Sequence, residues 1–464
     1  MDTHDHAPRT PVTDAETRLQ DLGYEQTLQR TMSLRDVVVY GLIYMVPLAP
    51  AAVFGAVFEF SKGQVALVYL VAAIAMFFSA VSYREMAARY PVAGSVYSYV
   101  RFGTGRLIGF IAGWAILLDY LLLPALLGIF GAAAINSEIP SIPSWVWIVP
   151  FVGVAAAINV RGISITARMN LVFLAIQLVA ISVFVGGALV AVAAGRAQLS
   201  FTPFFDSTYF SWSLVFSAIP IAALSYVGFD AISTLNEEAK GGGETVARAT
   251  MIVLGLVAAL FIAQVYFAAI FVPTPDAYVD SDLAATAFYD IAGVAVSPWF
   301  QTVFTLISAL VAIFANTLVS QATTSKLIFS MARDRQLPVA FARLSTRGVP
   351  IVALTVVTVL SIIIGLTAVG HIAEMTTLVT FGALTAYILL HISVLYRFGV
   401  LGGSDRKIFA HCISPVIGGG LLGYALWETT TDAKVLGLSW LAAGLLVAFV
   451  LGRRGTSLDT ADGF

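Results

Sequence analysis

The sequence predicts an all-α membrane protein with twelve transmembrane helices. Of its 464 residues, 59% are hydrophobic and only 11% carry a charge, against about 25% in an average soluble domain. The mean hydropathy is +0.89. So few charges could not cover the surface of a soluble protein of this size, and disorder would require low hydrophobicity with a high net charge. These values indicate a polytopic helical membrane protein.

The predicted elements follow from the apolar stretches. Residues 1–33 are polar and carry charges of both signs, so we interpret them as a tail rather than a secretory signal. A membrane helix needs about 20 mostly apolar residues. Such stretches lie near 34–60, 64–83, 106–132, 144–160, 170–194, 211–236, 249–272, 297–328, 350–368, 374–397, 408–427 and 435–452. Residues 453–464 form a second tail, which leaves 34–452 as one membrane domain.

The positive charges predict the orientation. With the N-terminus in the cytoplasm, 22 of the 25 lysines and arginines fall in inner segments, and only Lys62, Arg196 and Lys434 lie outside. Because positive residues concentrate on the cytoplasmic side, we expect a multi-pass protein of the cell membrane with both termini in the cytoplasm. The outer segment 273–296 holds four aspartates, and we interpret it as a solvated loop.

Two of the predicted spans carry helix breakers. The first contains Pro47 and Pro50, each of which removes a backbone donor and clashes with the preceding turn. The sixth contains Gly228 next to Asp230, an acidic residue that is costly in lipid. Paired interruptions in corresponding halves are typical of inverted-repeat transporters and mark their central binding site. The alternative is two unrelated kinks.

Four stretches resemble the amino acid–polyamine–organocation superfamily of permeases. They are 83–95 (YREMAARYPVAGS) with Tyr97, 113–120 (GWAILLDY), 226–231 (YVGFDA) with Glu237 and Glu238, and 330–338 (SMARDRQLP). Within the superfamily the chain looks most like putrescine-importer-type permeases. The resemblance implies a LeuT-like five-plus-five inverted repeat, with repeat one near 34–194, repeat two near 211–397 and two peripheral helices within 408–452. It also implies a secondary transporter, usually proton-coupled, that holds its substrate at the breaks of spans one and six.

The chain departs from that pattern at two points. Many amino acid permeases have a glycine-rich first break, whose amides cradle a carboxylate as backbone nests do. Here Pro47 and Pro50 remove donors, which favours an amine without a carboxylate. Several proton-coupled members carry a lysine in span five, where this chain has Gln177, which cannot titrate. We therefore expect coupling to a proton held elsewhere, or to sodium.

Two carboxylates lie at predicted membrane depth with no lysine or arginine beside them. A buried unpaired carboxylate is costly or takes up a proton, so it can bind an ammonium group or carry a coupling proton. We expect Asp230 at the cation site and Asp119 as a second anchor or proton carrier. The alternatives are helix capping by Asp230 and a structural hydrogen bond by Asp119.

The remaining candidates fall into three sets. The predicted substrate site comprises Tyr44, Met45, Val46, Pro47, Leu48, Asp119, Tyr226, Val227, Gly228, Phe229 and Asp230, with Trp114 and Tyr120 as further aromatic walls for an ammonium. The coupling candidates are Asp119, Gln177, Asn316, Thr317 and Ser320, whose oxygens suit a hard cation but serve equally in packing. The predicted inner gate comprises Arg84, Arg89, Glu237, Glu238 and Arg333, with solvated loop charges as the alternative. We interpret His391 as a packing residue rather than a proton carrier.

Other function classes fit poorly. No Gly-Lys pair exists, so a Walker A loop is excluded. Five histidines and the single Cys412 offer little to a membrane enzyme, and no repeated filter suggests a channel. The net charge of −2 gives no reason to expect nucleic acid. The sequence therefore predicts a permease for a small organic amine such as putrescine, with a neutral or cationic amino acid as the alternative substrate. It needs no cofactor beyond a coupling proton or sodium ion, and its partners are a small molecule and the lipid bilayer.

Overall fold

The computed structural model describes residues 30–90, 92, 95–138, 141–161, 163–278, 281–311, 316–369 and 372–453. The first half contains α2 (Leu34–Tyr44), α3 (Ala49–Phe60), α4 (Val65–Arg89), α5 (Ser95–Thr104), α6 (Arg106–Glu138), α7 (Ser144–Val160) and α8 (Ile163–Ala193). The second half contains α9 (Trp212–Tyr226), η1 (Phe229–Leu235), α10 (Gly242–Ala269), α11 (Ser281–Ala295), α12 (Pro298–Leu310), α13 (Thr317–Arg333), α14 (Ile351–Thr367) and α15 (Ile372–Val394). The chain ends with the short η4 (Leu395–Val400) and η6 (Phe409–Ile413), then α16 (Ser414–Glu428) and α17 (Thr431–Arg453). The two tails lie mostly outside the described residues.

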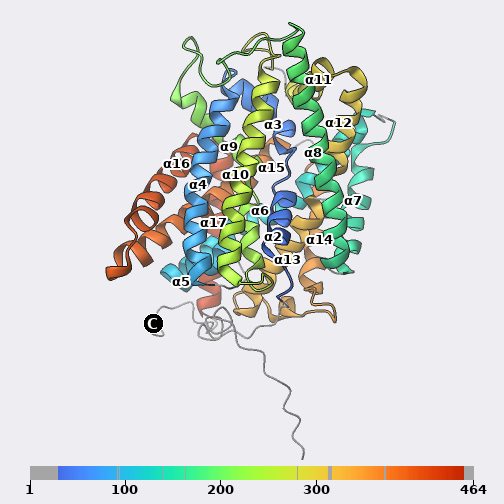
Figure 1. Cartoon of the computed structure of the whole chain (residues 1–464). Coiled ribbons are helices and arrows are strands. Elements are labelled where there is room, and N and C mark those ends of the chain that lie inside the picture. The colour runs from blue at the N-terminus through green and yellow to red at the C-terminus, as the bar shows by residue number, and fades with distance from the viewer. Residues whose placement is uncertain are drawn as a thin grey trace, which may run out of the picture.

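The helices form one bundle (Figure 1). Within the described residues, eight helices are long and apolar enough to cross a membrane, and the bent pair of α2 and α3 makes a ninth. Two shorter apolar helices occupy 145–160 and 351–367. The structure is 80% helix without a named strand in the described part, as the sequence predicts. Each predicted span overlaps at least one helix of the described residues.

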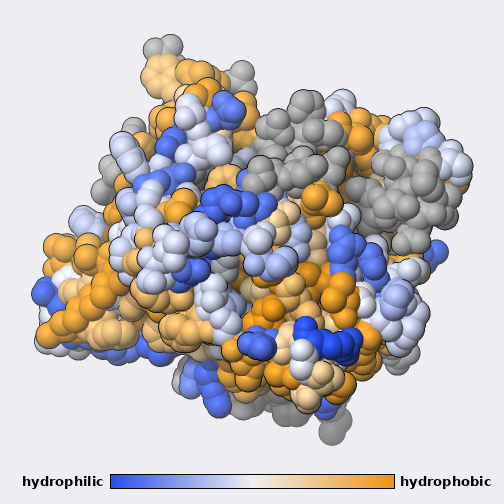
Figure 2. Space-filling view, turned by 90° about the horizontal axis from the view of Figure 1, so that it is seen from above, coloured by the Kyte–Doolittle hydropathy of each residue, from blue (hydrophilic) through white to orange (hydrophobic). Residues whose placement is uncertain are grey.

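Large apolar side chains are exposed along the flanks of the bundle, for example on α8, α16 and α17. On the end seen from above, hydrophilic residues are interspersed among hydrophobic ones (Figure 2). A soluble monomer rarely exposes so much contiguous apolar surface. The flanks are therefore surfaces for the hydrocarbon core of a bilayer.

Helices α2 and α3 occupy the lower and upper halves of the bundle and meet at its centre (Figure 1). The axes of the two helices differ by 45°. A capping box between Ser33 and Asp36 starts α2 at the lower end, and Pro50 lies in the first turn of α3. Helix α10 packs along both halves, α8 and η1 contact α2, and α9 and α11 contact α3. The break residues Tyr44, Met45, Val46 and Leu48 are buried.

The interpretation of 273–296 as a solvated loop is wrong. This segment contains α11, which packs against α3 and buries Ala287, Phe288, Ile291, Ala292 and Ala295. These positions recur with a helical period, a pattern that is characteristic of an amphipathic helix. The approach is close at Gly55 of α3, where an added Cβ would meet the backbone of Ala284. Helix α11 therefore covers the upper half of the first broken span.

Candidate functional site

The first break is a tight turn over Val46–Ala49. The amide of Ala49 donates to the carbonyl of Val46 at 2.8 Å, and Leu48 has φ −88° and ψ 1°. These are the values of the third residue of a type I turn, in which proline favours the second position. Val46 has φ +45°, which is strained for a β-branched residue. Such strain persists only where the surroundings hold it.

Every backbone amide at this break already has an acceptor. Within the turn and the flanking helix ends, Met45 donates to Gly41 at 3.0 Å, Val46 to Ile43 at 3.3 Å and Ala51 to Leu48 at 3.0 Å. The amide of Leu48 donates to Oε1 of Gln177 at 3.4 Å. On the acceptor side, the carbonyl of Pro47 receives Nε2 of Gln264 at 2.8 Å. The break therefore offers no free amide to an anion.

The second break lies between α9 and η1 and touches the first. Gly228 has φ +109°, and a Cβ built there would collide with the ring of Tyr44. Glycine is required here on both counts, since only it adopts this backbone freely. The ring of Tyr44 thus lies directly against the second break.

Asp230 is fully buried and held by hydroxyl groups. Its Oδ2 accepts from Tyr120 and from Ser95 at 3.3 Å, and its Oδ1 accepts from Tyr387 at 2.9 Å. These donors come from α6, α5 and α15. The residue that caps η1 is Gly228, without a side-chain bond, so the capping role considered for Asp230 is not seen. The carboxylate instead connects three helices to the second break.

Asp119 has a different environment. It is also fully buried, yet neither of its carboxylate oxygens makes a hydrogen bond with a described residue. Asp230 and Tyr44 are close enough to interact with it electrostatically. The structural hydrogen bond considered for Asp119 is therefore absent from the described part of the chain, which leaves this carboxylate able to accept a ligand.

A cavity of about 100 Å³ lies beside the first break. Its lining includes Tyr44, Met45, Val46 and Leu48 from the break, and Val227 from the second break. Further lining comes from α3, α6, α9, α11 and α12, with Leu123 of α6 one helical turn above Asp119. Neither Asp119 nor Asp230 lines it. The cavity wall is mostly apolar, and the carboxylates lie outside it.

The predicted aromatic walls separate in the structure. Tyr44 lines the cavity, whereas the ring of Phe229 packs against Tyr83 and Tyr387. Tyr226 donates to the carbonyl of Tyr69 at 3.0 Å. Trp114 stacks on Trp440 of α17, far along the sequence. Of these four aromatic residues, the structure places Tyr44 alone in the lining of this cavity.

The coupling candidates also lie in different places in the structure. Asn316 lines the cavity, while Ser320 donates to the carbonyl of Thr317 at 3.2 Å within α13. Gln177 contacts the first break instead of α13. Within the described residues no cluster of acidic, histidine or cysteine side chains could hold a metal. His391 lies between Ser79 and Ser82, at 3.1 and 3.0 Å, in agreement with a packing role.

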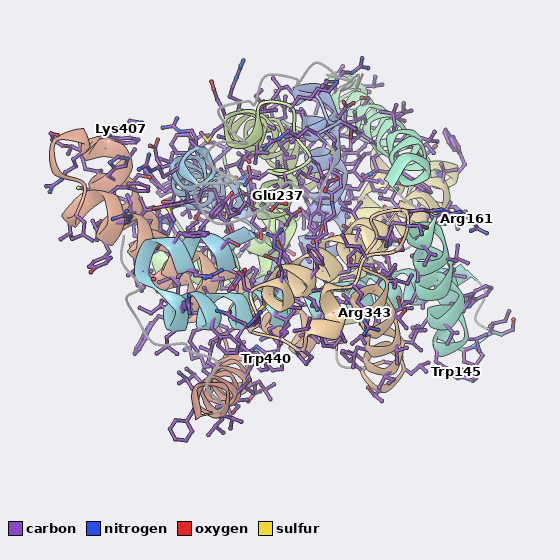
Figure 3. The ribbon with its side chains drawn as sticks, turned by 90° about the horizontal axis from the view of Figure 1, so that it is seen from below. Trp145, Arg161, Glu237, Arg343, Lys407 and Trp440 are labelled. Carbon is purple, nitrogen blue, oxygen red and sulfur yellow. The ribbon has the colours of Figure 1, made fainter. Side chains whose placement is uncertain are left out.

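Two carboxylates of the predicted gate form ion pairs at the lower end of the bundle. Glu237 pairs with Arg333 at 3.1 Å and Glu238 with Lys326 at 2.5 Å. Viewed from below, Glu237 lies near the centre of the bundle, whereas Arg161 and Lys407 lie at its edge (Figure 3). The other two candidates differ, because Arg84 pairs with Glu85 at 2.9 Å and Arg89 is exposed.

A second cavity, of about 460 Å³, opens between α2, α13 and α14 on the lower side of the break. Tyr40 and Ile43 of α2 line it, together with the Glu238–Lys326 pair. The segment before α2 closes one side of this region, since the amide of Met32 donates to the carbonyl of Glu238 at 3.0 Å. One turn of α2 therefore separates the two cavities.

Sequence reasoning missed Gln264 and Tyr387. Gln264 is a lone amide inside the apolar span 249–272, which should have marked it as a polar residue with a specific partner. Tyr387 carried no comparable mark, because tyrosine is common in membrane helices and its contact with Asp230 spans 157 positions.

Comparisons with known proteins agree with this picture. The amino acid permease family profile matches residues 37–425. The low-affinity putrescine importer PlaP of Escherichia coli (strain K12) is 31% identical, over 90% of this chain and 93% of its own length. The branched-chain amino acid permease BcaP of Lactococcus lactis is 25% identical, over 85% and 88%. The mouse cationic amino acid transporter 4 is 28% identical, over 81% of this chain and 61% of its own length. The matching proteins are transporters rather than enzymes.

Proposed function

The chain belongs to the amino acid permease family and is a multi-pass membrane protein, and from this premise we propose that it imports a small organic amine. Putrescine or a related polyamine is the proposed substrate. The proposed mechanism is ion-coupled secondary transport by alternating access, with a proton as the coupling ion. The resemblance to a putrescine importer over 90% of the chain supports the substrate class.

The observation that carries the proposal is the full occupation of the amides at the first break. A permease for α-amino acids must stabilise a carboxylate, and free backbone amides are the usual means. Here all donors between Met45 and Ala51 are engaged, and the two prolines have none. A substrate without a carboxylate places no demand on these groups.

The positive end of an amine requires an anion or an acceptor. Asp119 meets this need better than Asp230, because both of its oxygens lack a partner in the described structure whereas Asp230 already accepts from three hydroxyls. We assign Asp119 as the anchor that an ammonium group and the coupling proton share in turn. Asp230 supports the same region from beneath the second break. Movement of Tyr44 would join the upper cavity to Asp119.

The finer architecture belongs to the same proposal. We infer twelve membrane spans, with two inverted repeats of five that contain the broken spans one and six, and with both termini in the cytoplasm. The lower end in Figure 1 is then the cytoplasmic end. Sodium remains the alternative coupling ion, with Asn316 at the cavity as its candidate ligand.

A neutral or cationic amino acid is the second candidate substrate, favoured by the names of the relatives BcaP and cationic amino acid transporter 4. The two candidates differ in a carboxylate, so a binding screen separates them. We would measure the melting shift of the purified protein with putrescine, cadaverine, spermidine, agmatine and the common amino acids, since a ligand of the native state raises its stability.

We expect stabilisation by diamines that is lost in Asp119→Asn, with uptake of labelled putrescine lost in parallel. Asp230→Asn should lower the melting temperature of the free protein but leave part of the diamine shift. Stabilisation by amino acids and not by their decarboxylated amines would show that a carboxylate is recognised, and it would contradict the proposal.

A further inference from the structure

The peptide group between Pro47 and Leu48 is held from two sides. Its carbonyl accepts from Nε2 of Gln264 on α10 at 2.8 Å. Its amide donates to Oε1 of Gln177 on α8 at 3.4 Å. In a trans peptide the carbonyl and the amide point in opposite directions, so the two glutamines approach this single group from opposite flanks.

This peptide is the central one of the turn at the first break. In a type I turn the hydrogen bond joins the outer residues, here Val46 and Ala49. The central carbonyl and amide are left without a partner inside the turn. Because buried backbone groups must be paired, and no backbone group bonds to them here, the two side chains supply what the fold requires.

The neighbouring backbone stores strain. Val46, immediately before this peptide, has φ +45° and also lines the upper cavity. Both glutamines are fully buried, on helices that pack against α2, and α10 also packs against α3. The turn is thus strained at Val46 and hydrogen-bonded on both flanks of the next peptide.

We propose that Gln177 and Gln264 form a two-sided clamp that fixes the Pro47–Leu48 peptide and thereby positions the cavity wall at the first break. They are positioning residues that act through the backbone, without touching the substrate. Movement of α3 relative to α2 must then release at least one of the two bonds. The clamp rests on the proposed function in one respect, which is that uptake is used as one of its readouts.

The two glutamines have opposite hydrogen-bonding roles, so the same substitution by glutamate should affect them differently. Gln177 acts as an acceptor, and glutamate is a near-isosteric acceptor whether or not it is protonated. Gln264 acts as a donor, and glutamate donates only when protonated. We therefore expect Gln264→Glu to lose uptake relative to the wild type progressively as the pH is raised, by about tenfold at the alkaline end. Gln177→Glu keeps an acceptor in both protonation states, so its loss of uptake with rising pH should be smaller than that of Gln264→Glu.

The leucine variants test the bonds without a charge. Gln264→Leu and Gln177→Leu each remove one bond at every pH, so their deficit relative to the wild type should not recover on acidification. If uptake recovers at acid pH in Gln264→Glu but not in Gln264→Leu, the hydrogen-bond donor at position 264 is the group that uptake requires. Melting temperatures of all four variants show whether a loss of uptake reflects unfolding.

The rate of cysteine labelling tests the clamp in the absence of substrate. Cys412 is the single cysteine, so a Cys412→Ser background with Ala52→Cys in the cavity wall gives one reporter thiol. The thiolate fraction alone makes maleimide labelling depend on pH, so each rate is compared at the same pH with the reporter that keeps both glutamines. This relative rate should change with pH in Gln264→Glu and change less in Gln177→Glu. Labelling that follows this pattern in a protein that fails to transport amines would keep the clamp and refute the proposed function. Identical behaviour of the two glutamate variants, in uptake and in labelling, would refute the clamp.

Discussion

At the residue scale, small local features decide how the two breaks fit together. Proline starts the turn at the first break, and Gly228 lets the second break pass beneath the ring of Tyr44. The two buried carboxylates differ in their partners, since Asp230 is held by hydroxyls and Asp119 has no described hydrogen-bond partner. The contact between Tyr44 and Gly228 is therefore one place where the two broken spans constrain each other.

Gly228→Ala should destabilise the protein and abolish transport. The added Cβ would collide with the Tyr44 ring, and φ +109° is unfavourable for alanine, so we expect a cost of about 1–3 kcal/mol. The matched control is Gly186→Ala in α8, where a Cβ meets nothing within 4 Å. Melting temperature and uptake measure both variants. Equal melting temperatures for the two would contradict the close contact between the breaks.

At the element scale, the sequence predicted more of the helices than of their contacts. Prolines and glycine located both breaks, because their effect on a helix is local. Helix α11 was missed because the four aspartates of segment 273–296 indicated a solvated loop, although one face of the helix is apolar. The partners of Asp230 and of the Pro47–Leu48 peptide lie on other helices, and a periodic pattern places a side chain on a face without naming what that face meets. Gln177 was predicted as a coupling candidate, and in the structure its side chain accepts from the amide of Leu48 at the first break.

The lower end offers a test of how η1 and α13 are held together. Arg333→Glu should open this end, because it places two acidic groups together where Glu237 is fully buried and an unpaired buried charge is costly. A reporter at Ala322→Cys in the lower cavity, in the Cys412→Ser background, should then label faster. The exchange of both residues, Glu237→Arg with Arg333→Glu, should restore slow labelling. Failure of the double exchange to restore it in a folded protein would argue against a gate built on this pair.

At the scale of the whole molecule, the two cavities lie on opposite sides of the first break. Tyr44 lines the upper one, and Tyr40 and Ile43 line the lower one. A single turn of α2 is thus the wall between them. Because α2 is also tied to the chain beyond η1 through Met32, movement of this half-helix would change both cavities together.

This shared wall predicts reciprocal accessibility. In detergent, where both ends are open to reagent, putrescine should change the labelling rates of Ala52→Cys and Ala322→Cys in opposite directions. The physical reason is that one element cannot widen both cavities at once, and a ligand shifts the population only toward the state that it binds better. The Arg333→Glu variant shows which cavity opens when the other closes. Because it should open the lower end, it should speed labelling of Ala322→Cys and slow labelling of Ala52→Cys. Two rates that rise together would indicate a continuous pore or local unfolding, and two unchanged rates would mean that α2 does not couple the cavities.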